Sequence, residues 1–183
     1  MSRKKPKFGS ERDGLAVLGE APHALQGKSF VEARRWLARR IRIGTHCPLC
    51  NGFAKIYRRK ITGSMAASLI VLYFEHRRRR SWKSWIHFET VTASLSRKAA
   101  LRVRSRMLSV LRFWKLVECK TKGEGLRGYF RITPAGRRFV EEKLRVRRSA
   151  YIYNNYGLGL DGGKVGITDV MGEKFDYEEL MLT

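Results

Sequence analysis

The sequence predicts an α+β fold, and three observations lead to that prediction. Apolar residues recur at three- and four-residue spacing over residues 97–114, which indicates a strongly basic amphipathic helix. Residues 116–120 predict a short strand, and residues 128–133, which contain aromatic and β-branched residues, predict a second; they flank a polar segment with two glycines, so together they predict a β-hairpin. Finally, 43% of the 183 residues are hydrophobic, which suffices for the packed core of one domain with extensions.

Charge is the strongest compositional signal. The chain holds 39 Lys and Arg residues against 16 Asp and Glu, a net charge of +23. Residues 147–183 hold six acids against four bases, so the first 146 residues carry +25. A field of this size attracts any polyanion through counterion release, whether DNA, RNA or an acidic membrane surface.

No segment for export or membrane insertion is expected. The longest apolar run, residues 65–74, is too short to span a bilayer and contains Ser68. The first seven residues are cationic, with no apolar segment behind them, unlike a secretory signal. Three cysteines, an odd number, favour a reducing compartment. We therefore expect a cytoplasmic protein that does not engage membranes.

The amino-terminal part predicts a basic arm followed by a helix. Residues 1–28 are rich in Lys, Gly, Pro and Ser without periodicity and are expected to be flexible. Ser29 and Glu32 form a capping-box pattern, so a helix should begin there and run to about Ile43. Its many arginines either face phosphate or form a solvated charged surface.

Residues 47–50, Cys-Pro-Leu-Cys, resemble the knuckle of a zinc ribbon, in which backbone amides point at both thiolates. Cys47 and Cys50 are thus candidate metal ligands, and Zn²⁺ is the one cofactor that the sequence suggests. Tetrahedral zinc needs four ligands, and the chain has no second CxxC. The residues that could complete the site are His46, His76, His87 and Cys119. The alternative is a degenerate knuckle with two free thiols. Residues 53–61 then alternate like a strand.

The middle of the chain predicts its most apolar helix, which starts at Gly63-Ser64 and ends in four successive arginines, Arg77–Arg80. Cations suit a helix carboxyl end, but four exceed what capping needs, so phosphate contact and simple solvation both stay open. Residues 82–88 predict a short aromatic strand packed in the core, and residues 91–95 a short helix. Ser96 would then cap the helix over residues 97–114.

The helix over residues 97–114 has two contrasting faces. Apolar residues form the core-facing side: Leu101, Val103, Met107, Leu108, Val110, Leu111 and Trp114. Cations and small hydroxyls, with no acid, form the other side: Lys98, Arg102, Ser105, Arg106, Ser109 and Arg112. After the hairpin, Thr133 and Pro134 predict the start of a closing helix over residues 134–146.

This order of elements is that of a winged helix. Residues 114–118, WKLVE, and residues 128–139, GYFRITPAGRRF, resemble the end of the recognition helix, the wing and the closing helix of winged-helix (winged helix-turn-helix) DNA-binding proteins. The resemblance covers roughly residues 64–146. It implies insertion of the helix over residues 97–114 into a major groove, with the wing on the adjacent backbone. The residues that would face base edges are Arg102, Ser105, Arg106 and Ser109. Those that would hold phosphates are Lys98, Arg112, Lys120, Lys122 and Arg127. A winged fold that binds protein instead is the alternative.

Residues 147–183 predict an acidic extension. Strands over residues 150–156 and 164–168 would flank a turn at Asp161–Gly163, with short helical pieces after them. The extension either folds back on the basic body or holds a partner. The knuckle, the winged segment, YRRK at residues 57–60 and KFDYEELM at residues 174–181 together look like a family of uncharacterised bacteriophage proteins with a single CPxC knuckle. The expected location is the cytoplasm of a bacterial host, in association with the nucleoid.

The chain therefore divides into four predicted segments. These are a flexible arm (1–28), a helix with knuckle and strand (29–61), a winged-helix domain (62–146), and an acidic hairpin with a helical tail (147–183). We find no catalytic constellation, because acids before residue 147 are scattered singly apart from Glu141-Glu142, so an enzyme is not expected.

The expected function is binding of double-stranded DNA in phage transcription regulation or replication. A homodimer is a candidate assembly, since closing helices often serve dimerisation in winged-helix regulators. Two alternatives stay open. One is an RNA-binding or ribosome-like structural protein, and the other is a phage protein that inhibits a host nucleic-acid enzyme by protein contact.

Overall fold

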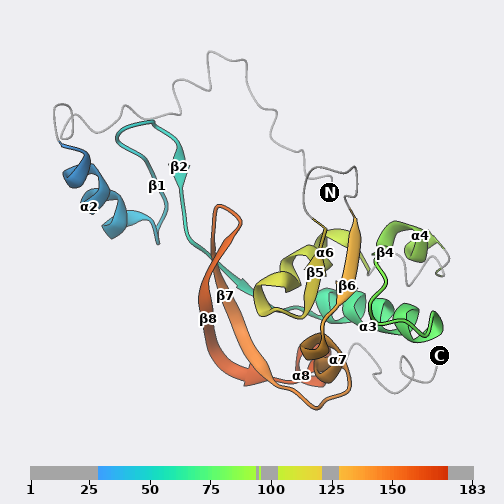
Figure 1. Cartoon of the computed structure of the whole chain (residues 1–183). Helices are drawn as coiled ribbons and strands as arrows, with labels where there is room; N and C mark the ends of the chain where they lie inside the picture. Colours follow the sequence, from blue (N-terminus) through green and yellow to red (C-terminus); the bar gives the residue numbers. More distant parts are fainter. Residues whose placement is uncertain (1–28, 94, 96–102, 121–127, 173–183) are drawn as a thin grey trace, which may run out of the picture. The chain divides into compact units, whose positions relative to one another are not determined.

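The described residues form an α+β fold with three small β-sheets (Figure 1). The structure is a computed structural model that describes residues 29–93, 95, 103–120 and 128–172. Contacts divide the chain into two compact units, the first ending at Tyr57 and the second beginning at Arg58. Each unit is described by itself.

The first unit pairs a helix with a short hairpin. Helix α2 (Phe30–Arg40) begins as predicted, because the Ser29 hydroxyl accepts from the Glu32 amide while the Glu32 carboxylate accepts from the Ser29 amide. It ends three residues earlier than expected. Strands β1 (Thr45–His46) and β2 (Phe53–Ala54) then pair antiparallel around the CPLC turn. The strand expected over residues 53–61 is interrupted, and its second half is β3 (Tyr57–Lys60).

The second unit contains the core of the molecule. In chain order its elements are β3, α3 (Gly63–Arg78), β4 (Ile86–His87), α4 (Phe88–Ala93), α6 (Ser105–Leu111), η2 (Arg112–Trp114), β5 (Val117–Cys119), β6 (Tyr129–Ile132), α7 (Pro134–Val140), β7 (Val146–Tyr153), β8 (Tyr156–Val165) and α8 (Ile167–Met171). One sheet has the strand order β4-β6-β5 and another has the order β3-β7-β8.

Helix α3 is the centre of this unit. Leu69, Ile70 and Leu72 are fully buried, and the helix packs against α6, α7, α8 and β6. A helix that is apolar on most of its circumference removes its side chains from water only when other elements pack on all sides of it. The predicted apolar helix is thus confirmed as the element on which the rest of the unit packs.

The predicted hairpin is confirmed as β5 and β6, which pair antiparallel with Val117 opposite Ile132 and Cys119 opposite Phe130. Its tip, residues 121–127, lies outside the described residues. Strand β4 pairs with the other edge of β6. After β6, the Thr133 hydroxyl accepts from the Gly136 amide and caps α7, as predicted. A Cβ at Gly136 would lie 2.1 Å from the Leu116 carbonyl oxygen, so only glycine fits there.

Part of the helix prediction over residues 97–114 is wrong. Residues 97–102 lie outside the described residues, and Val103 and Arg104 are not helical. Arg104 is extended (φ −143°, ψ 137°) because its amide donates to the Ser68 hydroxyl on α3 (3.3 Å) and Val103 is buried. The described helix therefore begins at Ser105, and a 3-10 turn, η2, extends it to Trp114.

The expected turn of the C-terminal hairpin is also wrong. Strands β7 and β8 turn at Asn154 and Asn155, which have φ values of 44° and 64°, the left-handed pair typical of a tight hairpin. Asp161, placed in the turn by the sequence, lies within β8 and accepts from Arg58 (3.1 Å) and from the Tyr151 hydroxyl (3.2 Å). Thr168, expected in a strand, lies in α8.

The closing helix is shorter than its predicted range of residues 134–146. Helix α7 ends at Val140, Glu142 has a φ of 58°, and Val146 already begins β7. The acidic extension folds back on the body up to Gly172, because α8 packs on α3 and Asp169 pairs with Arg145 (2.6 Å). Exposed pairs of this kind contribute little, so apolar packing of Ile167 and Met171 holds the segment.

Candidate nucleic-acid interface

Helix α6 is anchored on one side and basic on the other. Leu108 and Leu111 are fully buried against the core and fix the helix on α3. Arg104 and Arg106 are exposed at its beginning, and Ser105 and Ser109 are half-buried. The Ser109 hydroxyl donates to the Arg106 carbonyl oxygen (2.8 Å), so it is already engaged within the helix.

The positive charge of α6 is not neutralised within the described residues. Residues 103–111 contain no acid. Among the described residues, neither Arg104 nor Arg106 forms an ion pair. Two guanidinium groups on a fixed helix can donate to phosphate oxygens or to guanine edges, since their planar forks match both geometries.

Arg112 and Lys120 both contact other described residues. The Arg112 guanidinium lies 4.9 Å from the Phe113 ring centroid and donates to the Asn155 carbonyl oxygen (3.4 Å), so it faces the β7–β8 turn. The Lys120 ammonium lies 5.4 Å from the Trp85 ring and 5.8 Å from the Tyr129 ring. The remaining predicted contacts lie outside the described residues: Lys98, Arg102, Lys122 and Arg127.

Strand β4 presents an aromatic face that the sequence prediction placed in the core. Ile86 and Phe88 are buried as expected, but Trp85 and His87 are only half-buried. Arg131 lies 4.7 Å from the Trp85 ring, and His87 packs 4.9 Å from Tyr129. The alternation at residues 85–88 is the signal that could have separated the two faces. Cations already cover Trp85, so it is not a free stacking surface.

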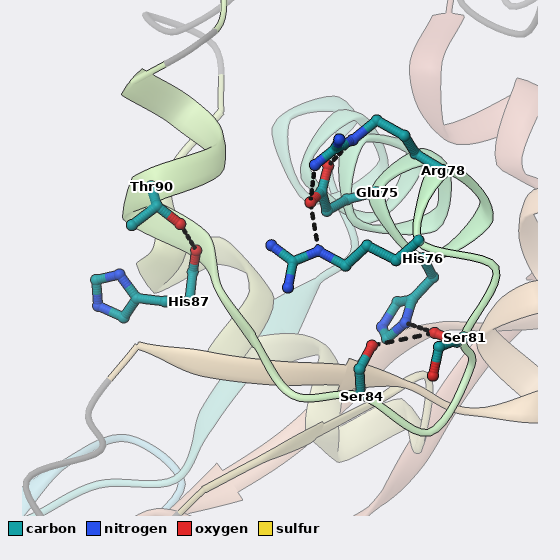
Figure 2. Close-up of polar contacts among 8 residues, drawn as sticks. Glu75, His76, Arg78, Ser81, Ser84, His87 and Thr90 are labelled. Carbon is teal, nitrogen blue, oxygen red and sulfur yellow. Dashed lines mark hydrogen bonds and ion pairs between the residues drawn. The ribbon is translucent and has the colours of Figure 1, made fainter.

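The arginine run at the end of α3 is partly neutralised by one acid. Arg78 donates to both carboxylate oxygens of Glu75 (2.8 and 2.9 Å), as Figure 2 shows, and Arg79 donates to one of them (2.6 Å). Hydrogen bonds from Arg78 and Arg79 lower the pKa of Glu75 against the opposing effect of burial. Two of the four arginines therefore hold a buried carboxylate, which weakens the run as a phosphate site.

His76 is a structural histidine that joins three elements. Its Nδ1 donates to the Ser81 carbonyl oxygen (2.8 Å), and its Nε2 accepts from the Ile132 amide (3.2 Å); Figure 2 shows the contact with Ser81. The residue is fully buried, and burial lowers its pKa. Because both ring nitrogens are occupied, His76 does not serve as a fourth ligand for the cysteine pair.

The CPLC turn is a tight loop that joins β1 to β2, closed by hydrogen bonds from the Cys47 amide to the Gly52 carbonyl oxygen and from the Asn51 amide to the Cys47 carbonyl oxygen. Backbone amides of Leu49 and Cys50 donate to the Cys47 sulfur and lower its pKa. The His46 ring packs edge-on against Phe53 (5.3 Å). Cys119, the third cysteine, is half-buried on β5, and this burial raises its pKa. Within the described residues, no three Cys, His, Asp or Glu side chains gather into a group that could hold a metal.

Comparison of the chain with protein-family models, with curated proteins and with solved structures gives no match. In the part of the chain that the structure describes, no helix combines the length and the apolar character needed to cross a membrane. Functional inference therefore rests on the geometry of the chain itself.

Proposed function

We propose that the chain is a winged-helix protein that binds double-stranded DNA, with α6 as its recognition helix. The observation that carries the proposal is the surface of α6, where Arg104 and Arg106 are exposed without an acidic partner among the described residues. Leu108 and Leu111 hold that surface rigidly on the core. A rigid, cationic helix surface is what major-groove recognition requires.

The arrangement around α6 supports the winged-helix interpretation. Helix α3, strand β4, helix α4 and helix α6 precede the β5–β6 hairpin, and β6 lies between β4 and β5 in the sheet. In winged-helix proteins the same order brings a recognition helix and a hairpin to one side of the domain. Lys120, directly after β5, would then contact the backbone next to the groove.

In this proposal the residues of α6 have different roles. Arg106 donates to base edges, most favourably to guanine, where a bidentate contact discriminates by about 1–3 kcal/mol. Arg104, at the amino end of the helix, donates to a phosphate, where the helix dipole adds to its charge. The remaining basic residues supply a sequence-independent attraction that weakens as salt rises. Transcription regulation and replication are the processes we expect for such a protein in a phage.

The test compares two arginine substitutions with the same change of charge. DNA would first be selected from a random duplex pool, and fluorescence anisotropy would then measure affinity for selected and random duplex across a salt series. Arg106→Ala should weaken binding to selected DNA by about 5- to 150-fold, equivalent to 1–3 kcal/mol, and weaken binding to random DNA much less. Arg138→Ala, an exposed arginine on α7, should lower both affinities slightly and equally.

Other outcomes would redirect the proposal. Equal losses in both variants would mean that α6 does not recognise bases. Tighter binding to folded RNA than to duplex DNA at matched salt would favour the RNA-binding alternative. Weak affinity for every nucleic acid, despite the net charge of +23, would favour a protein partner.

A further inference from the structure

The CPLC turn is closed by its own backbone. Strands β1 and β2 pair with Thr45 opposite Ala54 and His46 opposite Phe53. Inside this pair, the Cys47 amide donates to the Gly52 carbonyl oxygen and the Asn51 amide donates to the Cys47 carbonyl oxygen, both at 2.8 Å. Asn51 takes the left-handed conformation (φ 53°) that such a tight loop needs and that Asn tolerates. The loop is thus a folded hairpin end, not an extended connection.

This closed loop carries both thiols on one tight turn, three residues apart, with Cys47 half-buried and Cys50 exposed. The thiolate is the form of cysteine that ligates metals. The Cys50 sulfur is also within 3.4 Å of the position that a Cβ would take at Gly52, so glycine leaves room beside it.

The pair supplies half of a tetrahedral zinc site. Thiolates are preferred zinc ligands, and structural zinc takes four. The third cysteine, Cys119, is half-buried on β5, and the described residues offer no group of three potential ligands. A second copy of the chain brings the same two thiolates on the same rigid hairpin, which completes the set with one ligand type.

The residues around Cys47 and Cys50 are compatible with a second copy that completes the zinc site. Cys50 is exposed, and the nearby large apolar side chains of Leu49 and Phe53 are 55% and 57% exposed, so the described residues leave them uncovered. A second knuckle seated against the first would cover them. Four thiolates and one Zn²⁺ carry a net charge of −2, and a chain with a net charge of +23 offsets that negative charge.

We propose that two copies of this chain share one Zn²⁺ through Cys47 and Cys50 of each copy. Each thiol releases its proton to solvent as its sulfur binds the metal, and no oxidation or reduction is involved. The partner is a second copy of this chain, and the metal is the link between the two. This inference does not depend on nucleic-acid binding.

The experiment measures metal content and mass together. Full-length protein, reduced and free of metal, would be titrated with Zn²⁺ while light scattering after size exclusion reports its mass. We expect one tightly bound zinc for every two chains and conversion of monomer to dimer at the same point of the titration. A chelator should return the protein to monomer, and renewed zinc should restore the dimer. Replacement by Co²⁺ should give the absorption spectrum of a tetrahedral four-thiolate site.

Variants separate the proposed site from other sources of ligands. Cys47→Ser and Cys50→Ser should each lose both tight zinc binding and the zinc-dependent dimer. Cys119→Ser is the matched control and should keep both. His23 and His46 are the two histidines of the unit that ends at Tyr57, and His23→Ala and His46→Ala should also keep both properties, because the proposed site uses thiolates alone. If a cysteine variant misfolds, the unsubstituted protein still tests the proposal, because a chelator should dissociate its dimer and renewed zinc should restore it.

Several results would overturn the proposal. One zinc bound by each chain, with the mass unchanged, would mean that the chain completes the site by itself, and loss of zinc in His23→Ala would identify the residue. A dimer that forms equally well with chelator present would mean that zinc is not the link. No tight zinc binding at all would mean that the knuckle is degenerate.

Discussion

The two units of this chain differ in how many apolar side chains they bury. In the unit that begins at Arg58, the hydrophobic core is continuous from Ile61 to Met171 and includes the fully buried Leu69 and Phe139. In the unit that ends at Tyr57, the described residues contribute only Ala33 and Ala54 as buried apolar side chains. The same unit exposes large apolar side chains: Phe30, Val31, Ile43, Leu49, Phe53 and Tyr57.

The difference follows from the two principal helices. Helix α3 has few charges before its final turn and can be enclosed on most of its surface. Helix α2 carries four arginines, so only a narrow apolar stripe remains; they are Arg34, Arg35, Arg39 and Arg40. A unit this small rarely stabilises itself by apolar burial alone, and a metal or a partner commonly supplies the rest. The proposed zinc bridge would act in the unit with the smaller core.

The largest effect is expected from His76→Ala in the second unit. The change leaves a cavity in the core and removes the acceptor of the Ile132 amide and the donor to the Ser81 carbonyl. We expect the free energy of unfolding to fall by about 2–4 kcal/mol. Urea unfolding followed by tryptophan fluorescence would measure it. His87→Ala, a half-buried histidine on β4, is the control and should cost about 1 kcal/mol or less.

A loss of similar size in both variants would contradict this account. It would mean that the buried hydrogen bonds of His76 do not distinguish it from a histidine on the partly exposed face of the sheet. The stability of the second unit would then depend less on its buried core than we infer from its contrast with the first unit.

Acidification should produce a smaller loss of stability with a defined sign. Burial lowers the pKa of His76 in the folded state, and a proton on Nε2 would break its hydrogen bond with the Ile132 amide. The unfolded chain therefore binds more protons below about pH 6.5, the unperturbed histidine value, and stability falls as pH drops through that region. The lowered pKa of Glu75 adds a further loss below about pH 4.3.

The measurement is the free energy of unfolding between about pH 8 and pH 5 for the unsubstituted protein and for His76→Gln, since a glutamine amide can donate and accept but does not titrate there. We expect the decline toward pH 5 to be shallower in His76→Gln. Identical slopes would show that His76 is not the group responsible.

Local signals predicted much of the fold, and tertiary contacts account for most of what they missed. Ser29 and Thr133 cap their helices as the sequence predicted, because capping depends on neighbours three residues away. The start of α6 could not be found in this way, since Arg104 is held extended by Ser68, a residue 36 positions earlier. In the last hairpin the sequence analysis placed the turn at Asp161–Gly163, but the long-range pairing of Asp161 with Arg58 accompanies its place in β8, and Asn154-Asn155 forms the turn.

In the candidate site, too, local spacing predicted some features and long-range contacts determined others. Arg106, Ser105 and Ser109 lie on one short helix, as the helical spacing predicted. Arg112 was expected to hold phosphate, but it donates to Asn155 across a turn that helical periodicity alone could not place beside it. Spacing along a helix defines a face, whereas the neighbours of that face come from the rest of the fold.

The smallest effect is expected from the knuckle. With chelator present, Cys47→Ser and Cys50→Ser should change the free energy of unfolding of the second unit by less than about 0.5 kcal/mol, because its core cluster begins at Ile61. Urea unfolding at a probe in that core would measure it. Amide exchange gives the complementary result: zinc should slow exchange at residues 45–54 of the unsubstituted protein and leave residues 69–72 of α3 unchanged. A loss above about 1 kcal/mol in either cysteine variant, or slower exchange in α3 on zinc addition, would mean that the two units unfold as one. The small core of the first unit would then be stabilised by the second, and the knuckle would have no separate need for metal.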